Sequence, residues 1–261
     1  MAESTNPQSG PQASPADAAR LAATETSHDA LARAAVADIQ PGMIVGIGTG
    51  RTARRAIAAL AGRVVAENLD ITCVSTSEAS SAYAMELGIK VREFATIEHV
   101  DYLFDGADEI DGHLRMLKGA GGAMTRERLV ATAAARRVYL VEEEKLVDHL
   151  GERTPLAVAV MAFGLASIRA NLRTLGLSGV LRRSMDGTLY VTDNGNLILD
   201  VQLHGGRSGS DEDHNYERLA AALDHTPGVI EHGLFLTEAT EALVRRDDGS
   251  IERLLRPAEA E

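Results

Sequence analysis

The feature that most constrains the fold is an alternation of short apolar segments with segments of helical periodicity, joined by short loops that contain glycine. Buried strands are predicted for the apolar segments 43–47, 71–74, 89–91, 102–104 and 138–141. Helices are predicted for residues 28–37, 52–60, 79–87 and 126–135, with a further short helix that ends at Leu150. Strands that alternate with helices predict an α/β fold, in which helices cover a parallel sheet and ligands bind at the carboxyl ends of its strands.

The pattern changes after Gly151, where a smaller α+β unit is predicted over residues 152–228. Its predicted strands are 156–161, 180–183, 189–192 and 197–203, and its predicted helices are 166–175 and 216–223. Further strands are predicted for 229–236 and 242–245. We therefore expect residues 229–261 to complete the larger unit formed by residues 26–151. Residues 1–25 are rich in Ser, Pro, Ala, Gln and Thr and are expected to form a flexible tail.

Charge and composition argue against several classes of protein. The 261 residues include 26 Lys and Arg against 38 Asp and Glu, a formal net charge of −12. This charge disfavours general nucleic-acid binding but allows a small anionic ligand at a focused positive site. The first residues lack the pattern of a signal peptide, and the apolar stretch 156–166 is shorter than the roughly 20 residues of a membrane span. With Cys73 as the single cysteine, we expect no intramolecular disulfide and a reducing cytoplasm.

A glycine-rich motif lies between the first predicted strand and the helix that follows it. Residues 46–52 read Gly-Ile-Gly-Thr-Gly-Arg-Thr. Glycines at the start of a helix let backbone N–H groups approach an anion, and the hydroxyls of Thr49 and Thr52 add hydrogen-bond donors. The spacing matches neither a Walker loop nor the dinucleotide fingerprint. A phosphate site and a tight strand-to-helix turn are both open interpretations of this motif.

Two further segments concentrate charged residues at predicted strand ends. Residues 105–111 contain four acids directly after an apolar strand, and residues 118–127 run from a lysine through a glycine-rich loop into a helix. Glu127 falls in the first turn of that helix, where the helix dipole favours a charged carboxylate. Each segment alone would suit a solvated loop, but together they favour a site for proton transfer. The eight histidines lack the spacing of a zinc site.

At these motifs the sequence closely resembles the type A ribose-5-phosphate isomerase family. The segments that carry the resemblance are VGIGTGRTA (45–53), DGADEIDGHLRMLKGAGGAMTRERLV (105–130), EEKLVDHLG (143–151), TDNGNLILDV (192–201) and PGVIEHGLF (227–235). They occur in the order typical of the family and extend over nearly the whole chain from about residue 28. The resemblance implies a Rossmann-like catalytic domain with a smaller, ferredoxin-like domain that acts as a lid and in oligomerisation. It also implies a homodimer or homotetramer.

The reaction that the resemblance implies is the interconversion of ribose 5-phosphate and ribulose 5-phosphate through an enediolate, without metal or cofactor. Glu127 would be the base that moves a proton between C1 and C2, and Lys118 would stabilise the oxyanion. Asp105 and Asp108 would bind sugar hydroxyls and assist ring opening and proton transfer between oxygens. The implied substrate-binding residues are Thr49, Gly50, Arg51, Thr52, Gly106, Ala107, Gly119, Ala120, Gly121 and Lys145.

Two departures from the family pattern leave the exact sugar open. Arg51 stands where the family's loop usually has a serine, and His28 stands where the family often has a phosphate-binding lysine. Arg51 either supplies the missing charge as a phosphate clamp or indicates a different aldose or aldose phosphate. A non-catalytic sugar-phosphate sensor is a further alternative, although this sequence keeps both Glu127 and Lys118.

Overall fold

The largest of three sheets carries the motifs at one of its edges. In the computed structural model, which describes residues 14–203 and 215–256, six strands lie in the order β13-β12-β6-β3-β1-β2. These strands are β1 (Ile44–Ile47), β2 (Thr72–Ser75), β3 (Val100–Gly106), β6 (Ala134–Glu142), β12 (Glu241–Arg245) and β13 (Ile251–Leu255). Neighbours run parallel, except that β12 and β13 form an antiparallel hairpin. The predicted parallel sheet is confirmed.

The order of these strands determines where a ligand binds. The chain passes from β1 to β2 on one side and then crosses to β3 on the other side of β1. The strand order therefore reverses between β1 and β3. In open sheets of this type, ligands bind in the crevice at such a reversal, outside the carboxyl ends of the strands. The loops that follow β1 and β3 hold the glycine-rich motif and the first acidic motif.

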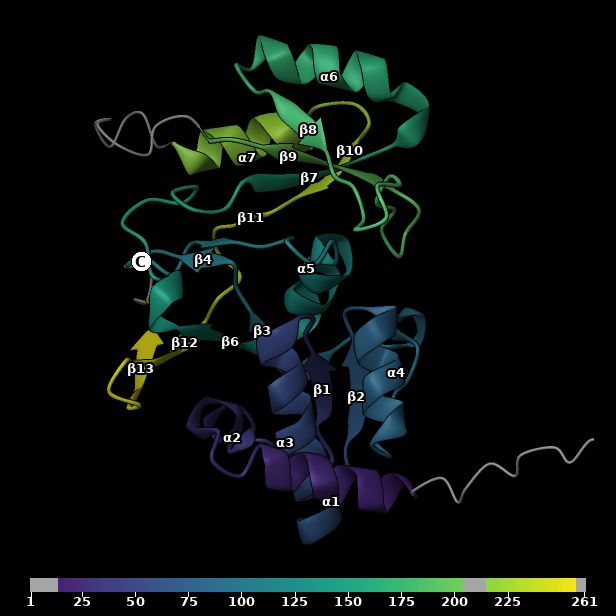
Figure 1. Ribbon diagram of the computed structural model, residues 1–261, viewed down its shortest axis with the longest axis vertical. Helices are drawn as coiled ribbons and strands as arrows, with labels where there is room; N and C mark the ends of the chain where they lie inside the picture. The colour runs from purple at the N-terminus through teal and green to yellow at the C-terminus, as the bar shows by residue number, and fades with distance from the viewer. Residues whose placement is uncertain (1–13, 204–214, 257–261) are drawn as a thin grey trace, which may run out of the picture.

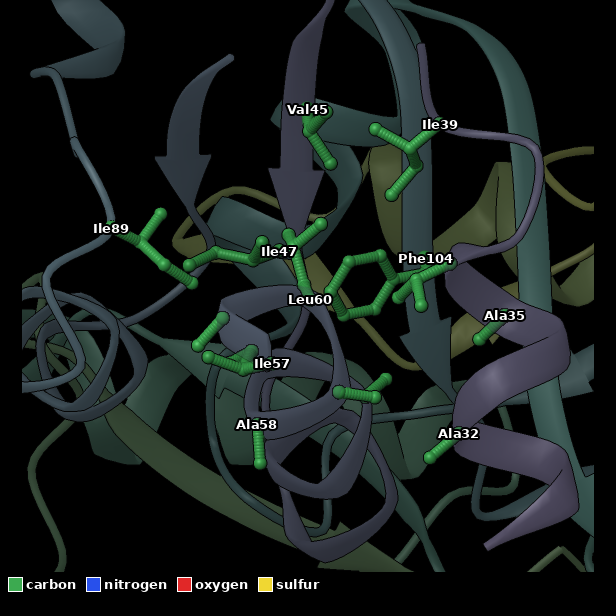
Figure 2. Packing of buried hydrophobic residues seen from close by; sticks show 14 of the residues in the cluster. Ala32, Ala35, Ile39, Val45, Ile47, Ile57, Ala58, Leu60, Ile89 and Phe104 are labelled. Atoms are coloured by element: carbon green, nitrogen blue, oxygen red, sulfur yellow. The ribbon is translucent and has the colours of Figure 1, made fainter. Parts of the chain in front are cut away.

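Helices pack on both faces of this sheet. They include α2 (Ala30–Val36), α3 (Arg51–Glu67), α4 (Glu78–Glu86) and α5 (Met124–Ala133). Ile47 and Phe104 belong to one core cluster with Leu60 of α3 (Figure 2). Leu103 points to the opposite face, because side chains alternate along a strand, and it clusters with Val130 of α5. None of the helices in the described ranges is long and apolar enough to cross a lipid bilayer.

The N-terminal segment differs from the prediction. Helix α1 (Pro15–Glu25) crosses α3 (Figure 1), and two of its alanines are buried. The two helices approach closely, because a Cβ at Gly62 would lie 2.5 Å from the Cβ of Ala23. The expectation of a flexible tail over 1–25 is therefore wrong for this helix, since small side chains can bury a helix without large apolar groups. Residues 1–13 lie outside the described ranges.

The smaller unit lies at the opposite end of the molecule from α1 (Figure 1). Its elements are β7 (Leu156–Val160), α6 (Leu165–Thr174), β8 (Gly179–Leu181), β9 (Leu197–Val201), α7 (Tyr216–Asp224) and β10 (Val229–His232). The strands form an antiparallel sheet in the order β10-β7-β9-β8. This order, with the βαββαβ sequence of elements, is the ferredoxin-like arrangement.

Three short strands form a further sheet between the two units. They are β4 (Glu109–Ile110), β5 (Met116–Leu117) and β11 (Leu234–Phe235). The strand predicted at 229–236 is thus two strands, split at Gly233. The first of them, β10, belongs to the four-stranded sheet of the smaller unit, and the second, β11, to the three-stranded sheet. The smaller unit therefore includes β10, and the boundary that we predicted after residue 228 lies too early in the chain. The split occurs because Gly233 bonds to Lys118 and Ala157 on different elements.

Three other predicted elements are shorter than expected. Residues 89–91 and 189–192 form only isolated bridges. The short helix predicted to end at Leu150 is limited to the 3-10 turn η2 (Glu143–Lys145). Further 3-10 turns are η1 (Phe94–Thr96) and η3 (Ala162–Gly164).

Candidate active site

Three loops enclose a cavity of about 120 Å³ at the strand reversal. The first loop follows β1 and opens α3, the second follows β3, and the third connects β5 to α5. The predicted residues that line the cavity are Thr49, Gly50, Arg51, Thr52, Gly106, Ala107, Asp108, Lys118, Gly119, Gly121 and Glu127. Segments that are far apart in the sequence therefore meet where the strand pattern placed a ligand.

The loop after β1 is shaped around Asp105. A side chain at Gly48 would put its Cβ 2.1 Å from Asp105 Oδ1, so only glycine lets the two strand ends approach. Asp105 Oδ1 accepts hydrogen bonds from the backbone N–H of Thr49 at 3.0 Å and of Gly106 at 2.7 Å. Gly50 has a φ of 98° and forms the N-cap of α3. The N-terminus of this helix therefore lies at the cavity, where its dipole favours an anion.

An ammonium and two carboxylates are buried together beside the cavity. Lys118 Nζ lies 2.9 Å from Asp105 Oδ2 and 3.4 Å from Glu127 Oε2. Lys118 Nζ also donates a hydrogen bond of 2.5 Å to the backbone oxygen of Gly106. Burial lowers the pKa of Lys118, but the charges of Asp105 and Glu127 outweigh this effect and hold the pKa above its usual value. Lys118 is therefore an ammonium at neutral pH.

Glu127 is the member of this cluster that can exchange a proton near neutral pH. It lies in the first turn of α5, and 7% of its side chain is exposed. Burial raises the pKa of its carboxyl, the charge of Lys118 lowers it, and the charges of Asp105 and Asp108 raise it again, so that the resulting pKa is about 8. A base loses and regains a proton during turnover, so a pKa near the working pH suits that role.

Side chains of the smaller unit form hydrogen bonds to the loop after β5, and no sequence motif predicted these contacts. Arg182 donates hydrogen bonds to the carbonyl oxygens of Gly119 at 2.7 Å and Ala120 at 2.9 Å. The hydroxyl of Tyr190 donates a hydrogen bond to the carbonyl oxygen of Gly121 at 2.9 Å. On the same loop, the N–H of Ala120 donates to Asp108 Oδ2 at 2.8 Å. These bonds orient the Asp108 carboxylate through a loop that is more than 60 residues away from Arg182 in the sequence.

Other predicted residues do not line the cavity. Asp105 is fully buried beneath it, and Ala120 is exposed. Lys145 lies half-buried in η2, and His28 is exposed before α2. Arg51 lines both this cavity and an adjacent one of about 490 Å³, so it is the cation best placed to meet a ligand that extends between them.

The fold and the site together define an α/β enzyme in which a buried cluster of one lysine and two carboxylates lies beside a cavity at the strand reversal. Among the residues that the structure describes, no group of three or more His, Cys, Asp or Glu is arranged to hold a metal ion. A family model described as ribose 5-phosphate isomerase A (phosphoriboisomerase A) matches residues 72–249. The chain belongs to this family.

Similar proteins extend over most of the chain. The ribose-5-phosphate isomerase A of Roseiflexus sp. (strain RS-1) is 45% identical over 219 residues, which cover 84% of this chain and 91% of the relative. The solved structure of ribose 5-phosphate isomerase A from Methanocaldococcus jannaschii is 32% identical with a TM-score of 0.78, and the match covers 89% of this chain and 99% of that one. A D-ribose-5-phosphate isomerase in complex with phospho-erythronic acid is 30% identical with a TM-score of 0.79, again over 89% and 99% of the chains. The resemblance inferred from the motifs is confirmed.

Proposed function

We propose that this chain interconverts ribose 5-phosphate and ribulose 5-phosphate, with Glu127 as the base. The observation that carries the proposal is the distance of 3.4 Å between Glu127 Oε2 and Lys118 Nζ, in a cluster beside the cavity at the strand reversal. A carboxylate that accepts a proton from carbon needs a nearby cation for the negative charge that develops on oxygen.

In the proposed reaction, the open-chain aldose binds with C1 and C2 beside Glu127. Glu127 removes the proton from C2, and the electron pair moves toward O1 to form an enediolate. Lys118 stabilises the negative charge on O1. Asp108 moves the proton of O2 to O1, and Glu127 returns its own proton to C1, which gives the ketose. Asp105 does not line the cavity, so we assign it to holding Lys118 through their contact of 2.9 Å.

The pH dependence of the reaction follows from Glu127. Below a pH of about 8 its carboxyl becomes protonated and cannot accept the proton from carbon. We therefore expect kcat/KM, which reports the free enzyme, to fall as the pH decreases through this value. Initial rates measured across the pH range in which the protein stays folded test this expectation. A profile that stays level down to the usual pKa of a glutamate, about 4.3, would contradict it.

We place the phosphate of the substrate at the N-terminus of α3. Gly50 caps this helix, Arg51 and Thr52 begin it, and all three residues line the cavity. Helix N-termini bind phosphate through N–H groups and the helix dipole, and arginine adds charge-assisted hydrogen bonds. A related D-ribose-5-phosphate isomerase was solved in complex with phospho-erythronic acid, a ligand that carries a phosphate.

Replacing Arg51 by alanine is expected to raise KM for ribose 5-phosphate about tenfold, with kcat changed by less than about twofold. The reason is that a phosphate contact remote from C1 and C2 stabilises the substrate and the transition state alike. Steady-state kinetics measure both constants. Arg54→Ala is the matched control, because Arg54 lies on the same helix, stacks on Tyr83 and does not line the cavity. An unchanged KM in the Arg51 variant would remove Arg51 from the phosphate site.

The direct test of the proposed function is turnover of ribose 5-phosphate by the purified chain, compared with four- to six-carbon aldose phosphates. Ribose 5-phosphate is expected to have the highest kcat/KM. A higher value for another sugar would move the assignment to that substrate. Binding of ribose 5-phosphate without turnover would indicate a sensor.

We also propose that the chain forms a homodimer or homotetramer in the cytoplasm, and that the smaller unit acts as a lid and takes part in assembly. Large apolar side chains on this unit support an interface, since Phe163 is 97% and Val180 is 75% exposed. Light scattering of the purified protein tests the assembly, and a monomer at working concentration would contradict it.

A further inference from the structure

Arg128, the residue after Glu127 on α5, binds the same short segment that binds Lys118. The Arg128 guanidinium donates hydrogen bonds to the carbonyl oxygens of His232 at 2.9 Å and Leu234 at 2.8 Å. Between these two residues, the carbonyl of Gly233 accepts the backbone N–H of Lys118 at 2.9 Å. The carbonyls of residues 232 and 234 thus bind Arg128, and the carbonyl between them binds the backbone of Lys118.

Charged and aromatic groups complete the environment of Arg128. Its Nε lies 2.8 Å from Glu231 Oε1, and its Nη1 forms an ion pair with Glu238. The guanidinium carbon lies 4.1 Å from the centre of the Phe235 ring, which is 5.7 Å from Lys118 Nζ. The planar guanidinium therefore meets two carboxylates, two carbonyls and a ring, a combination that the point charge of a lysine cannot reproduce.

The segment itself has little freedom to move. A Cβ at Gly233 would lie 2.1 Å from the backbone oxygen of Lys118, so the two backbones are in close contact. The N–H of Gly233 donates to Ala157 on β7 at 2.8 Å. Residues 232–234 are therefore fixed both to Lys118 and to the four-stranded sheet, and Arg128 fixes α5 to this segment. Figure 1 shows that α5 lies between the two units, so the contact of Arg128 with His232 joins the larger unit to the smaller one.

We infer that Arg128 is a positioning residue that sets the distance between the Glu127 carboxylate and the Lys118 ammonium. Glu127 and Lys118 belong to separate elements, α5 and the loop after β5. The segment 232–234 connects these elements, and Arg128 donates hydrogen bonds from α5 to two of its carbonyls. A displacement of about 1 Å at a reacting group can reduce the rate about 100-fold, so this contact bears directly on turnover. The inference depends on the proposed role of Glu127.

The test compares Arg128→Gln and Arg128→Lys with a matched control, Arg136→Gln. Arg136 also contacts two carboxylates, Glu241 and Asp38, and an aromatic ring, but it lies at the amino end of β6, away from the cavity. Arg128→Gln is expected to lower kcat by about 10- to 100-fold with KM changed by less than about twofold. Arg128→Lys should fall between this variant and the wild type.

The pH profile separates positioning from a general loss of stability. Lys118 lowers the pKa of Glu127, so a longer distance between them should move the acid limb of kcat/KM to higher pH in both Arg128 variants. Arg136→Gln should lower the melting temperature and leave kcat and the acid limb unchanged. Rates are measured below the melting temperature of every variant, and Arg128→Lys decides the question if Arg128→Gln does not fold.

Two results would overturn the inference. One is a kcat and an acid limb in the Arg128 variants equal to those of Arg136→Gln. The other is a loss of kcat with the acid limb unmoved, because the distance to Lys118 would then be unaltered. The proposed function fails in a different way, through an Arg128-independent result: full turnover by Glu127→Gln or no turnover by the wild type.

Discussion

Replacing Glu127 by glutamine is expected to lower kcat for ribose 5-phosphate by about 10²- to 10⁴-fold, the contribution that general acid–base catalysis makes. An amide has nearly the shape of the carboxylate but cannot accept the proton from C2. KM should change little, because Glu127 acts on the C–H bond rather than on the phosphate. Steady-state kinetics on the purified variant, followed by exchange of the C2 proton with solvent, measure the loss.

The fold should survive this change. Lys118 keeps its contact of 2.9 Å with Asp105 and its hydrogen bond to Gly106, so no buried ammonium is left unpaired. Circular dichroism and the melting temperature should therefore match the wild type. Glu86→Gln, an exposed site on α4, is the control for the substitution itself. Turnover within about tenfold of the wild type would exclude Glu127 as the base.

Replacing Lys118 by glutamine is expected to reduce both turnover and stability. Loss of one donor to a developing oxyanion costs about 10²- to 10³-fold in kcat. Without the ammonium, the pKa of Glu127 rises further, because Lys118 is the charge that lowers it. The acid limb of kcat/KM should therefore move to higher pH, in addition to the fall in rate.

The stability effect comes from the two carboxylates that Lys118 leaves behind. Asp105 is fully buried and Glu127 nearly so, and removing one partner of a buried ion pair costs roughly 3–5 kcal/mol. Chemical denaturation measures this loss. Lys90→Gln, an exposed lysine after α4, should leave both properties unchanged. A Lys118 variant with normal kcat and a normal unfolding curve would contradict the buried cluster.

Much of the site could be predicted because its residues stand next to recognisable local patterns. Glycines after an apolar run predicted the loop of residues 48–50, and acids after another run predicted Asp108 at a strand end. Lys118 and Glu127 stand at the two ends of one glycine-rich segment, so a single stretch of sequence predicted both. Lys145 was inferred from the resemblance alone, and it lies outside the cavity that the other residues line.

The sequence by itself determined the parallel sheet, the order of its helices and the strand ends at which the charged motifs stand. Those features depend on periodicity and on glycine, which act over a few residues. Only the tertiary structure decided that α1 packs on α3, that Gly233 divides two strands, and that Arg128 and Arg182 brace the site. These contacts join segments that are distant in the chain, and they depend on how small side chains, carbonyls and carboxylates come together once the core is buried. No local sequence pattern predicts contacts between such distant segments. The raised pKa of Glu127 also depends on them, because the burial that raises it exists only in the folded chain.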